Sequence, residues 1–360
     1  MNQPVLHLPG PVLVGPDDVA GPLWVVGGRL TFTAPASGEV STIEGFVLPG
    51  LVDAHCHVGL DAHGAVDDET TLAQALADRD AGALLLRDAG SPADTRWIDD
   101  RDDLPRVIRA GRHIARTRRY VRNYAHEIEP DQLAGYVTQE ARRGDGWVKI
   151  VGDWIERDTG DLAPCWPLDA LRAAMSAAHA EGARVTAHCF SEEALPDLIA
   201  SGIDGIEHAT GLTHDTIGRA AAQQVAIVPT LVNIANFPNF ADAGQAKFPA
   251  YAAHMRALHA RRYETVRNAF DAGVPMYVGT DAGGSLPHGL VAQEVAELVA
   301  AGIPQRAALD AGCWAARRWL GRPGLGEGEP ADLVVYTADP REDVAVLAHP
   351  TAVVLRGRTV

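Results

Sequence analysis

The middle of this 360-residue chain alternates short apolar runs with alanine-rich segments, and this pattern constrains the fold more than any other feature. The runs have the length of strands buried on both faces, and the segments between them carry apolar residues at helical spacing. Glycine follows several of these segments, as it commonly follows the end of a helix. The expected strands are Val47–His57, Ala83–Arg87, Arg106–Ala110, Trp147–Val151, Arg184–His188, Gly205–His208, Ala226–Thr230 and Met276–Thr280. The expected helices include Thr71–Ala81, Leu168–Glu181, Glu192–Ser201, Tyr251–Ala272 and Leu290–Ala301.

Eight strand–helix units of this kind predict an α/β protein whose residues 49–324 form a (β/α)8 TIM barrel. The main alternative is a doubly wound open sheet. That fold would need a glycine-rich phosphate turn after an early strand, and the sequence has none. We therefore expect a barrel, in which the carboxyl ends of the strands meet at one mouth.

The two ends of the chain differ from the middle because they carry short β-type runs separated by Gly and Pro. Examples are Leu23–Val26 and Leu30–Thr33 near the start, and Asp332–Tyr336 and Thr351–Leu355 near the end. Chain termini often lie close together in a domain. We therefore predict a small β-sandwich domain made of residues 1–48 and 325–360.

Composition narrows the classes of function. The formal net charge of −16 disfavours nucleic acid as a partner, and no apolar run is long enough to span a membrane. The start of the chain lacks the basic residues of a secretory signal. The cysteines show no C-x-x-C spacing and are expected to be reduced thiols in a cytoplasmic protein. They are Cys56, Cys165, Cys189 and Cys313.

The most informative polar residues are His55 and His57, which lie two positions apart at the end of the first expected barrel strand. Side chains two apart on a strand point to the same face, with Cα atoms about 6.6 Å apart. Two imidazoles can therefore face one metal ion. The alternative is a pair of hydrogen-bonded core histidines.

Polar residues recur in or directly after four other expected strands: Lys149, His188, His208 and Asp281. Each buried polar group would cost several kcal/mol if it had no partner. A shared metal site at the mouth of the barrel explains all of them together, so we predict one there.

The sequence resembles the amidohydrolase superfamily of metal-dependent hydrolases along nearly its whole length. The resemblance rests on Gly45–His57, Gly279–Gly283 and Gly328–Val335. Within the superfamily, the chain is most similar to imidazolonepropionase-like and Xaa-Pro or Xaa-Arg dipeptidase-like hydrolases. The segments that carry this closer similarity are Leu86–Gly90, Thr186–His188, Gly205–His208 and Thr280–Gly283.

The resemblance implies a site with two metal ions, for which Zn²⁺ suits the ligands best. His55 and His57 would bind one ion together with Asp281, and His188 and His208 would bind the other. Lys149 would carry a carbamate derived from CO₂ that bridges the two ions. The alternative is an unmodified Lys149 in a salt bridge beside a single metal.

A hydroxide bridging the two metals would then attack an amide, a peptide bond of a dipeptide, or a cyclic amide. Asp281 would take the proton of the nucleophile and pass it to the leaving group. Two alternatives within the enzymes are a mononuclear imidazolonepropionase- or deaminase-type ring hydrolase and a lactonase or esterase. Outside the enzymes, the alternative is a non-catalytic metal-binding scaffold.

Substrate binding is expected from the arginine-rich segment Arg109–Arg122, which follows the third strand. From it we predict substrate contacts by His113, Arg118, Arg119 and Tyr120, and from the loop after Asp281 a contact by His288. Arginines favour an anionic small-molecule substrate. The alternatives are a solvated charged surface and an exposed loop histidine. The dipeptidase-like branch tends to have Gly-Gly-His where this chain has Thr117–Tyr120. The alanine-rich helices also allow a homo-oligomer.

Overall fold

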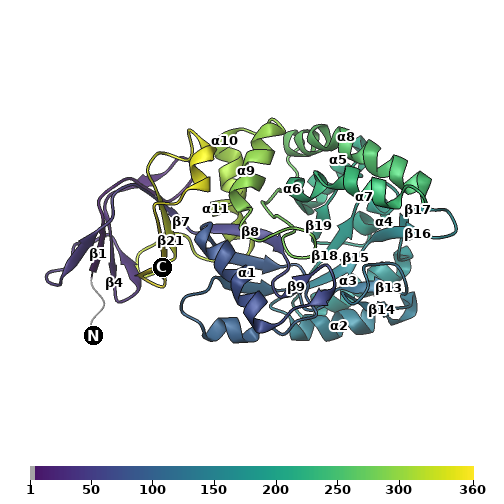
Figure 1. Cartoon of the computed structure of the whole chain (residues 1–360), viewed down its shortest axis with the longest axis horizontal. Helices are drawn as coiled ribbons and strands as arrows, with labels where there is room; N and C mark the ends of the chain where they lie inside the picture. Colours follow the sequence, from purple (N-terminus) through teal and green to yellow (C-terminus); the bar gives the residue numbers. More distant parts are fainter. Residues whose placement is uncertain (1–4) are drawn as a thin grey trace.

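Two small β-sheets built from both ends of the chain lie beside a larger α/β domain in the computed structural model, which describes residues 5–360 (Figure 1). One sheet has the strand order β5-β4-β1-β6, and the other has the order β23-β22-β21-β7-β2-β3. These strands are β1 (Val5–Leu8), β2 (Val12–Leu13), β3 (Val19–Ala20), β4 (Leu23–Val26), β5 (Arg29–Thr31), β6 (Val40–Thr42), β7 (Phe46–Pro49), β21 (Leu333–Tyr336), β22 (Ala352–Leu355) and β23 (Arg358–Thr359).

The two small sheets share one apolar core. Leu6 and Val25 from the first sheet belong to the same buried cluster as Val47 and Val335 from the second. Strands β7 and β21 pair antiparallel, with Leu48 opposite Val334, so the second sheet joins the two ends of the chain. The two ends of the chain thus lie together, and the small β-sandwich domain stays a prediction. The domain boundaries at residues 48 and 325 stay predictions.

The larger domain is built on parallel pairing. Strands β12-β11-β8 form one sheet, and β13-β15-β18-β19-β20 run side by side in another. The third expected strand, Arg106–Ala110, corresponds to β12, which pairs with β11. The chain continues after Gly111 into a further strand, β13, which pairs with β15. The strands are β8 (Leu51–Cys56), β11 (Ala83–Asp88), β12 (Arg106–Arg109), β13 (Ile114–Arg116), β14 (His126–Ile128), β15 (Trp147–Val151), β18 (Arg184–Cys189), β19 (Gly205–His208) and β20 (Ala226–Val228).

The eighth expected strand, 276–280, is an irregular segment. A parallel bridge joins Met276 to Ile227 on β20, and the Ala54 amide on β8 donates to the Val278 carbonyl at 2.8 Å. The segment therefore lies between the last and the first strand of the series. Gly279 allows this close approach, because a Cβ there would lie 2.6 Å from the Cβ of His55. The regular closed (β/α)8 ring stays a prediction.

Helices follow the strands and cover the larger domain (Figure 1). They are α1 (Asp68–Asp80), α2 (Leu133–Arg143), α3 (Leu168–Ala180), α4 (Leu195–Ala200), α5 (His214–Gln223), α6 (Leu231–Ile234), α7 (Phe237–Gly244), α8 (Pro249–Asp271), α9 (Val291–Ala300), α10 (Gln305–Ala311) and α11 (Trp314–Trp319). Short 3₁₀ helices are η1 (Arg96–Asp100), η2 (Pro130–Gln132) and η3 (Val344–Ala348). Two hairpins complete the fold: β9 (Leu60–Asp61) with β10 (Gly64–Ala65), and β16 (Asp153–Glu156) with β17 (Asp161–Pro164).

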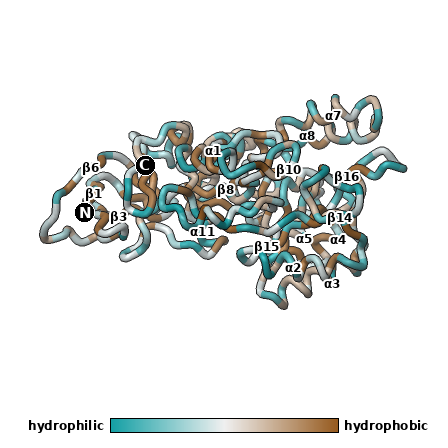
Figure 2. The backbone as a smooth tube through the Cα atoms, turned by 60° about the horizontal axis from the view of Figure 1, so that its bottom comes forward, coloured by the Kyte–Doolittle hydropathy of each residue, from teal (hydrophilic) through white to brown (hydrophobic). Residues whose placement is uncertain are grey.

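Apolar stretches of the chain run through the interior of the larger domain, for example along β8 (Figure 2). All six residues of β8 and all six of β11 are buried, as expected for parallel strands covered on both faces. Across residues 5–360, no helix combines the length and the apolar character that a bilayer span requires.

Candidate metal centre

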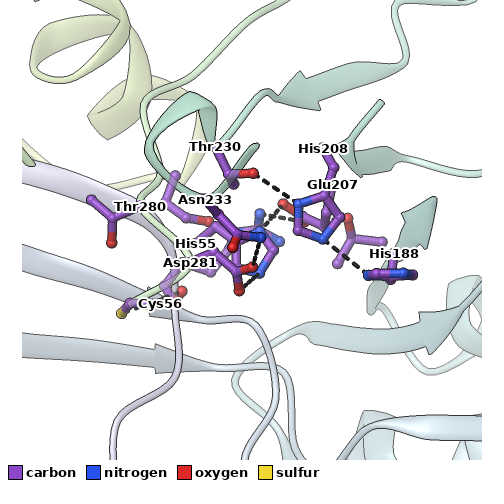
Figure 3. A network of polar contacts seen from close by, with 12 residues as sticks. His55, Cys56, His188, Glu207, His208, Thr230, Asn233, Thr280 and Asp281 are labelled. Carbon is purple, nitrogen blue, oxygen red and sulfur yellow. Dashed lines mark hydrogen bonds and ion pairs between the residues drawn. The ribbon is translucent and has the colours of Figure 1, made fainter. Parts of the chain in front are cut away.

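Side chains from separate strands converge where the expected carboxyl ends meet (Figure 3). His55 on β8 and His57 just beyond it bring their Nε2 atoms to 3.2 Å from each other. The Asp281 Oδ1 atom lies 3.0 Å from both of these nitrogens. His55 is buried, whereas the Asp281 side chain is 18% exposed, so the cluster can be reached from solvent through the carboxylate.

The neighbours of the two imidazoles fix where their protons lie. The His57 Nδ1 atom is 2.7 Å from the Gly90 carbonyl oxygen, and the His55 Nδ1 atom is 2.8 Å from the Glu207 carboxylate. Both partners can only accept, which favours the hydrogen of each ring on Nδ1. With both rings neutral in this form, three acceptor atoms face one another: the two Nε2 atoms and the Asp281 oxygen.

The charges around this cluster favour a cation. Burial lowers the pKa of His55, but the carboxylates of Glu207 and Asp281 outweigh it and raise the pKa overall. Burial lowers the pKa of His57, which keeps that ring neutral near pH 7. A cation placed between the Glu207 and Asp281 carboxylates would therefore be stabilised.

A second pair of imidazoles lies beside the first. The His188 Nδ1 atom is 3.0 Å from the His208 Nε2 atom, and the His208 Nδ1 atom is 2.8 Å from the Thr230 hydroxyl. Ligand atoms of His55, His208 and Asp281 all lie within 4.8 Å of one another. Burial lowers the pKa of both His188 and His208, so both rings are neutral and can offer lone pairs.

Lys149 lies in the middle of β15 and is buried. Its amine makes no hydrogen bond or ion pair to any residue of the part of the chain that the structure describes. Burial lowers the pKa of Lys149 to about 8, so more of the amine is neutral at pH 7 than in an ordinary lysine. A neutral amine is the form that adds CO₂, and the resulting carbamate would carry a negative charge that a metal cation could balance.

These residues fit a divalent metal. Convergent imidazole lone pairs and a carboxylate are the donor set that Zn²⁺ prefers, and related first-row metals accept the same donors. Without a cation, the three facing acceptors would repel one another. The positions of these atoms therefore support metal binding by themselves.

Comparison with known proteins agrees with this geometry. The family model described as "Amidohydrolase family" matches residues 46–360, which include every residue of the candidate metal centre. The chain belongs to the amidohydrolase family. It is a hydrolase by that membership, and the resemblance predicted from the sequence is confirmed.

Relatives of this amidohydrolase include uncharacterized proteins of Mycobacterium tuberculosis and Mycobacterium bovis. Each is 57% identical over 356 residues, covering 98% of this chain and 95% of the relative. A crystal structure of a Xaa-Pro dipeptidase with bound methionine in the active site is 21% identical, with a TM-score of 0.82 and coverage of 99% of both chains. A prolidase complexed with N-methylphosphonate-L-proline gives a TM-score of 0.78 at 21% identity, again with 99% coverage of both. The two structures show that the fold is shared.

The amidohydrolase holds His55 in place through a buried charge network that the sequence analysis missed. One oxygen of Glu207 contacts His55, and the other lies 2.6 Å from the Arg87 guanidinium and also accepts from the Thr186 hydroxyl. Arg87 in turn stacks 4.6 Å from the centre of the Trp147 ring. The signal in the sequence was a charged residue in the interior of two otherwise apolar strands.

Asp281 is positioned by its neighbours and by its backbone. Asn233 donates a hydrogen bond to Asp281 Oδ2 at 2.6 Å, which leaves Oδ1 facing the imidazoles. Asp281 itself has a φ of 59°, a left-handed conformation that is uncommon outside glycine and clusters at functional sites. The preceding residue, Thr280, is fixed by a 2.5 Å hydrogen bond from its hydroxyl to Asp53.

Two of the predicted substrate residues lie next to the metal centre. The His113 ring is 5.0 Å from the His57 ring and 5.3 Å from the Tyr120 ring. Tyr120 also lies 5.5 Å from the His188 ring. His113 is fully buried, and neither of its ring nitrogens has a hydrogen-bond partner within residues 5–360.

The other three predicted substrate residues lie in different surroundings. Arg118 is exposed, whereas the Arg119 guanidinium is buried and bonded to protein acceptors. The His288 side chain is only 2% exposed and places Nδ1 at 2.7 Å from the Asp78 carboxylate. A contact of these residues with substrate stays a prediction.

Proposed function

We propose that this chain is a metal-dependent amidohydrolase on a (β/α)8 barrel that cleaves an amide, a dipeptide or a cyclic amide. The observation that carries the proposal is the convergence of three potential ligand atoms, the Nε2 atoms of His55 and His57 and the Oδ1 atom of Asp281, at 3.0–3.2 Å from one another. Membership of the amidohydrolase family supports the class of reaction.

In this proposal, two Zn²⁺ ions are held at the strand ends. His55, His57 and Asp281 would hold one, His188 and His208 would hold the other, and a carbamate on Lys149 would supply a ligand to both. The Lys149 amine makes no direct hydrogen bond or ion pair with the nearby carboxylates of Glu207 and Asp281, which favours the bridge over a salt-bridged lysine beside a single metal. When bound, the ions would polarise the substrate carbonyl and lower the pKa of a water molecule.

The residues of the chain have separate tasks in the reaction. The Asp281 carboxylate accepts the proton of the attacking water and delivers it to the nitrogen that leaves. Asn233 orients that carboxylate through its hydrogen bond to Oδ2. Glu207 keeps the proton of His55 on Nδ1, so that the lone pair on Nε2 stays directed at the metal.

The test combines metal analysis with a substrate panel. We expect about two zinc ions per chain after preparation with bicarbonate, and loss of one of them in Lys149→Ala. One ion per chain regardless of bicarbonate would favour the mononuclear ring hydrolase. Metal-loaded protein should hydrolyse members of a panel of dipeptides, lactams and esters. Full metal loading without any turnover would overturn the proposal and favour a scaffold.

A further inference from the structure

Two aromatic side chains form a wall beside the second pair of imidazoles. The Tyr120 ring lies 5.5 Å from the His188 ring, and the Trp154 ring lies 5.4 Å from it. The two rings meet edge to face at 4.9 Å. Both are only partly buried, although they rest directly on a predicted metal ligand. We call Tyr120 and Trp154 the aromatic wall.

Arg119 fixes this wall in place. Its guanidinium donates to the Trp154 carbonyl at 2.9 Å and to the Ala163 carbonyl at 2.8 Å, and it pairs with the Glu156 carboxylate. These acceptors lie on the β16–β17 hairpin, and Arg119 directly precedes Tyr120. The guanidinium therefore joins the loop that carries Tyr120 to the hairpin that carries Trp154.

The same contacts remove Arg119 as a receptor for a carboxylate. Its side chain is only 6% exposed, and Glu156 already balances its charge. Arg109, the other buried arginine of the segment, binds Asp99 and Asp145 in the same way. A carboxylate packed on the aromatic wall would lose part of its hydration and find neither buried arginine free to compensate for it.

We propose that the substrate group beside the scissile bond is flat, uncharged and aromatic, and that it packs on Tyr120 and Trp154 instead of presenting a free carboxylate to an arginine. This inference rests on the proposed function and names its substrate class. Aromatic pairs in such a geometry are stabilised by about 0.5–1.5 kcal/mol beyond the burial of their surface. Arg119 is a positioning residue in this arrangement.

The first experiment compares matched substrates on the metal-loaded enzyme. Met-Phe and its C-terminal amide differ only in the charge next to the aromatic residue, and the amides of Met-Phe and Met-Ala differ only in the ring. We expect kcat/KM to be at least about 10-fold higher for Met-Phe amide than for either of the other two. A preference for the free acid would overturn the inference while leaving the amidohydrolase function intact. Absence of turnover on this panel and on esters would overturn both.

Variants identify the residues responsible. Trp154→Leu should lower kcat/KM for Met-Phe amide about 5- to 10-fold and change that for Met-Ala amide little. Trp24→Leu is the control, because Trp24 stacks on His7 in the small sheets. Equal losses on both amides in Trp154→Leu, with an unchanged ratio, would contradict recognition by the wall.

Arg119→Lys separates positioning from binding of a carboxylate. Lysine keeps the charge, but its single nitrogen cannot bind the two carbonyls and Glu156 as the two guanidinium nitrogens do. If Arg119 positions the wall, KM rises for aromatic substrates whether they are charged or neutral, and the thermal stability of the variant falls. A rise in KM confined to the free acid would show that Arg119 binds a carboxylate and would overturn the inference.

Discussion

In two buried places of this protein, histidine lies beside aspartate. The two places contain the same residue types but differ in which atoms carry a hydrogen. In the metal centre, His55 and His57 both donate elsewhere, so their lone pairs and the Asp281 oxygen face one another. At α1, His288 donates to Asp78, whose second oxygen accepts from the Gly289 amide. In the first set acceptor atoms face one another, whereas in the second both oxygens of Asp78 face donors, although the His288 Nε2 atom has no hydrogen-bond partner. Counting donors and acceptors therefore separates a candidate metal site from a structural ion pair, which residue types alone do not.

The largest expected effect comes from Asp281→Asn. The amide keeps the shape of the side chain but cannot accept and return a proton, so we expect turnover to fall by about 10³-fold or more. Metal content, measured by elemental analysis, should remain largely unchanged. A variant with the full rate would refute the proton-transfer role of Asp281.

Glu207→Gln should act on the metal through His55. The neutral amide binds the His55 Nδ1 hydrogen less strongly and leaves Arg87 without its charged partner, so zinc affinity should fall about 10- to 100-fold. Competition with a chelator measures this. Glu140→Gln is the control, since Glu140 is also fully buried and pairs with His126 away from the centre. Equal zinc affinity in the wild type and Glu207→Gln would remove the positioning role.

His288→Ala tests the structural ion pair between His288 and Asp78. Removing the imidazole leaves the buried Asp78 carboxylate without its partner, and we expect the free energy of unfolding to fall by about 3 kcal/mol. Metal content and kcat of the folded protein should stay unchanged. A raised KM with unaltered stability would instead support the predicted contact of His288 with substrate.

The smallest effect is expected at His254, which lies between Asp161 and Glu192. The hydrogen bond to Glu192, opposed by burial and supported by Asp161, raises the pKa of His254 to about 9. Because the folded pKa exceeds the unfolded value near 6.5, the stabilisation is complete below about pH 6.5 and is lost as the pH rises through 9.

Since His254 is partly exposed, His254→Gln should lower the free energy of unfolding by only about 1 kcal/mol at pH 6. The difference from the wild type should disappear by about pH 10. Denaturant unfolding at both pH values measures it. A difference that grows with pH would show that His254 is uncharged in the folded protein.

Much of the fold could be predicted because its strands and helices leave local signals. The expected strands at Trp147–Val151 and Gly205–His208 match β15 and β19 to the residue. The eighth strand could not be predicted in its detail. Its apolar pattern is regular, but Gly279 and the left-handed Asp281 allow a close contact with His55 that breaks the ladder. Such a contact depends on the neighbouring strand.

The candidate site was predictable to a similar degree. Histidines two apart on a buried strand already indicate a metal, and the structure brings His55 and His57 together. The contacts of the arginines could not be predicted, because they depend on where acceptors from distant parts of the chain lie. Arg119 finds two carbonyls on the β16–β17 hairpin, about forty residues along the chain, and the sequence gives no sign of that meeting. Glu207 was missed because its partner Arg87 comes from a strand far away in sequence.

The pairing of β7 with β21 also has a consequence for biosynthesis. On the ribosome, β7 emerges early and has no antiparallel neighbour until nearly all of the polypeptide has been made. During that interval its apolar edge, with Val47 and Leu48, is open to chaperones or to strands of other nascent molecules. A premature stop shortly before residue 333 would leave this edge permanently open, and such products should be removed by proteases rather than accumulate.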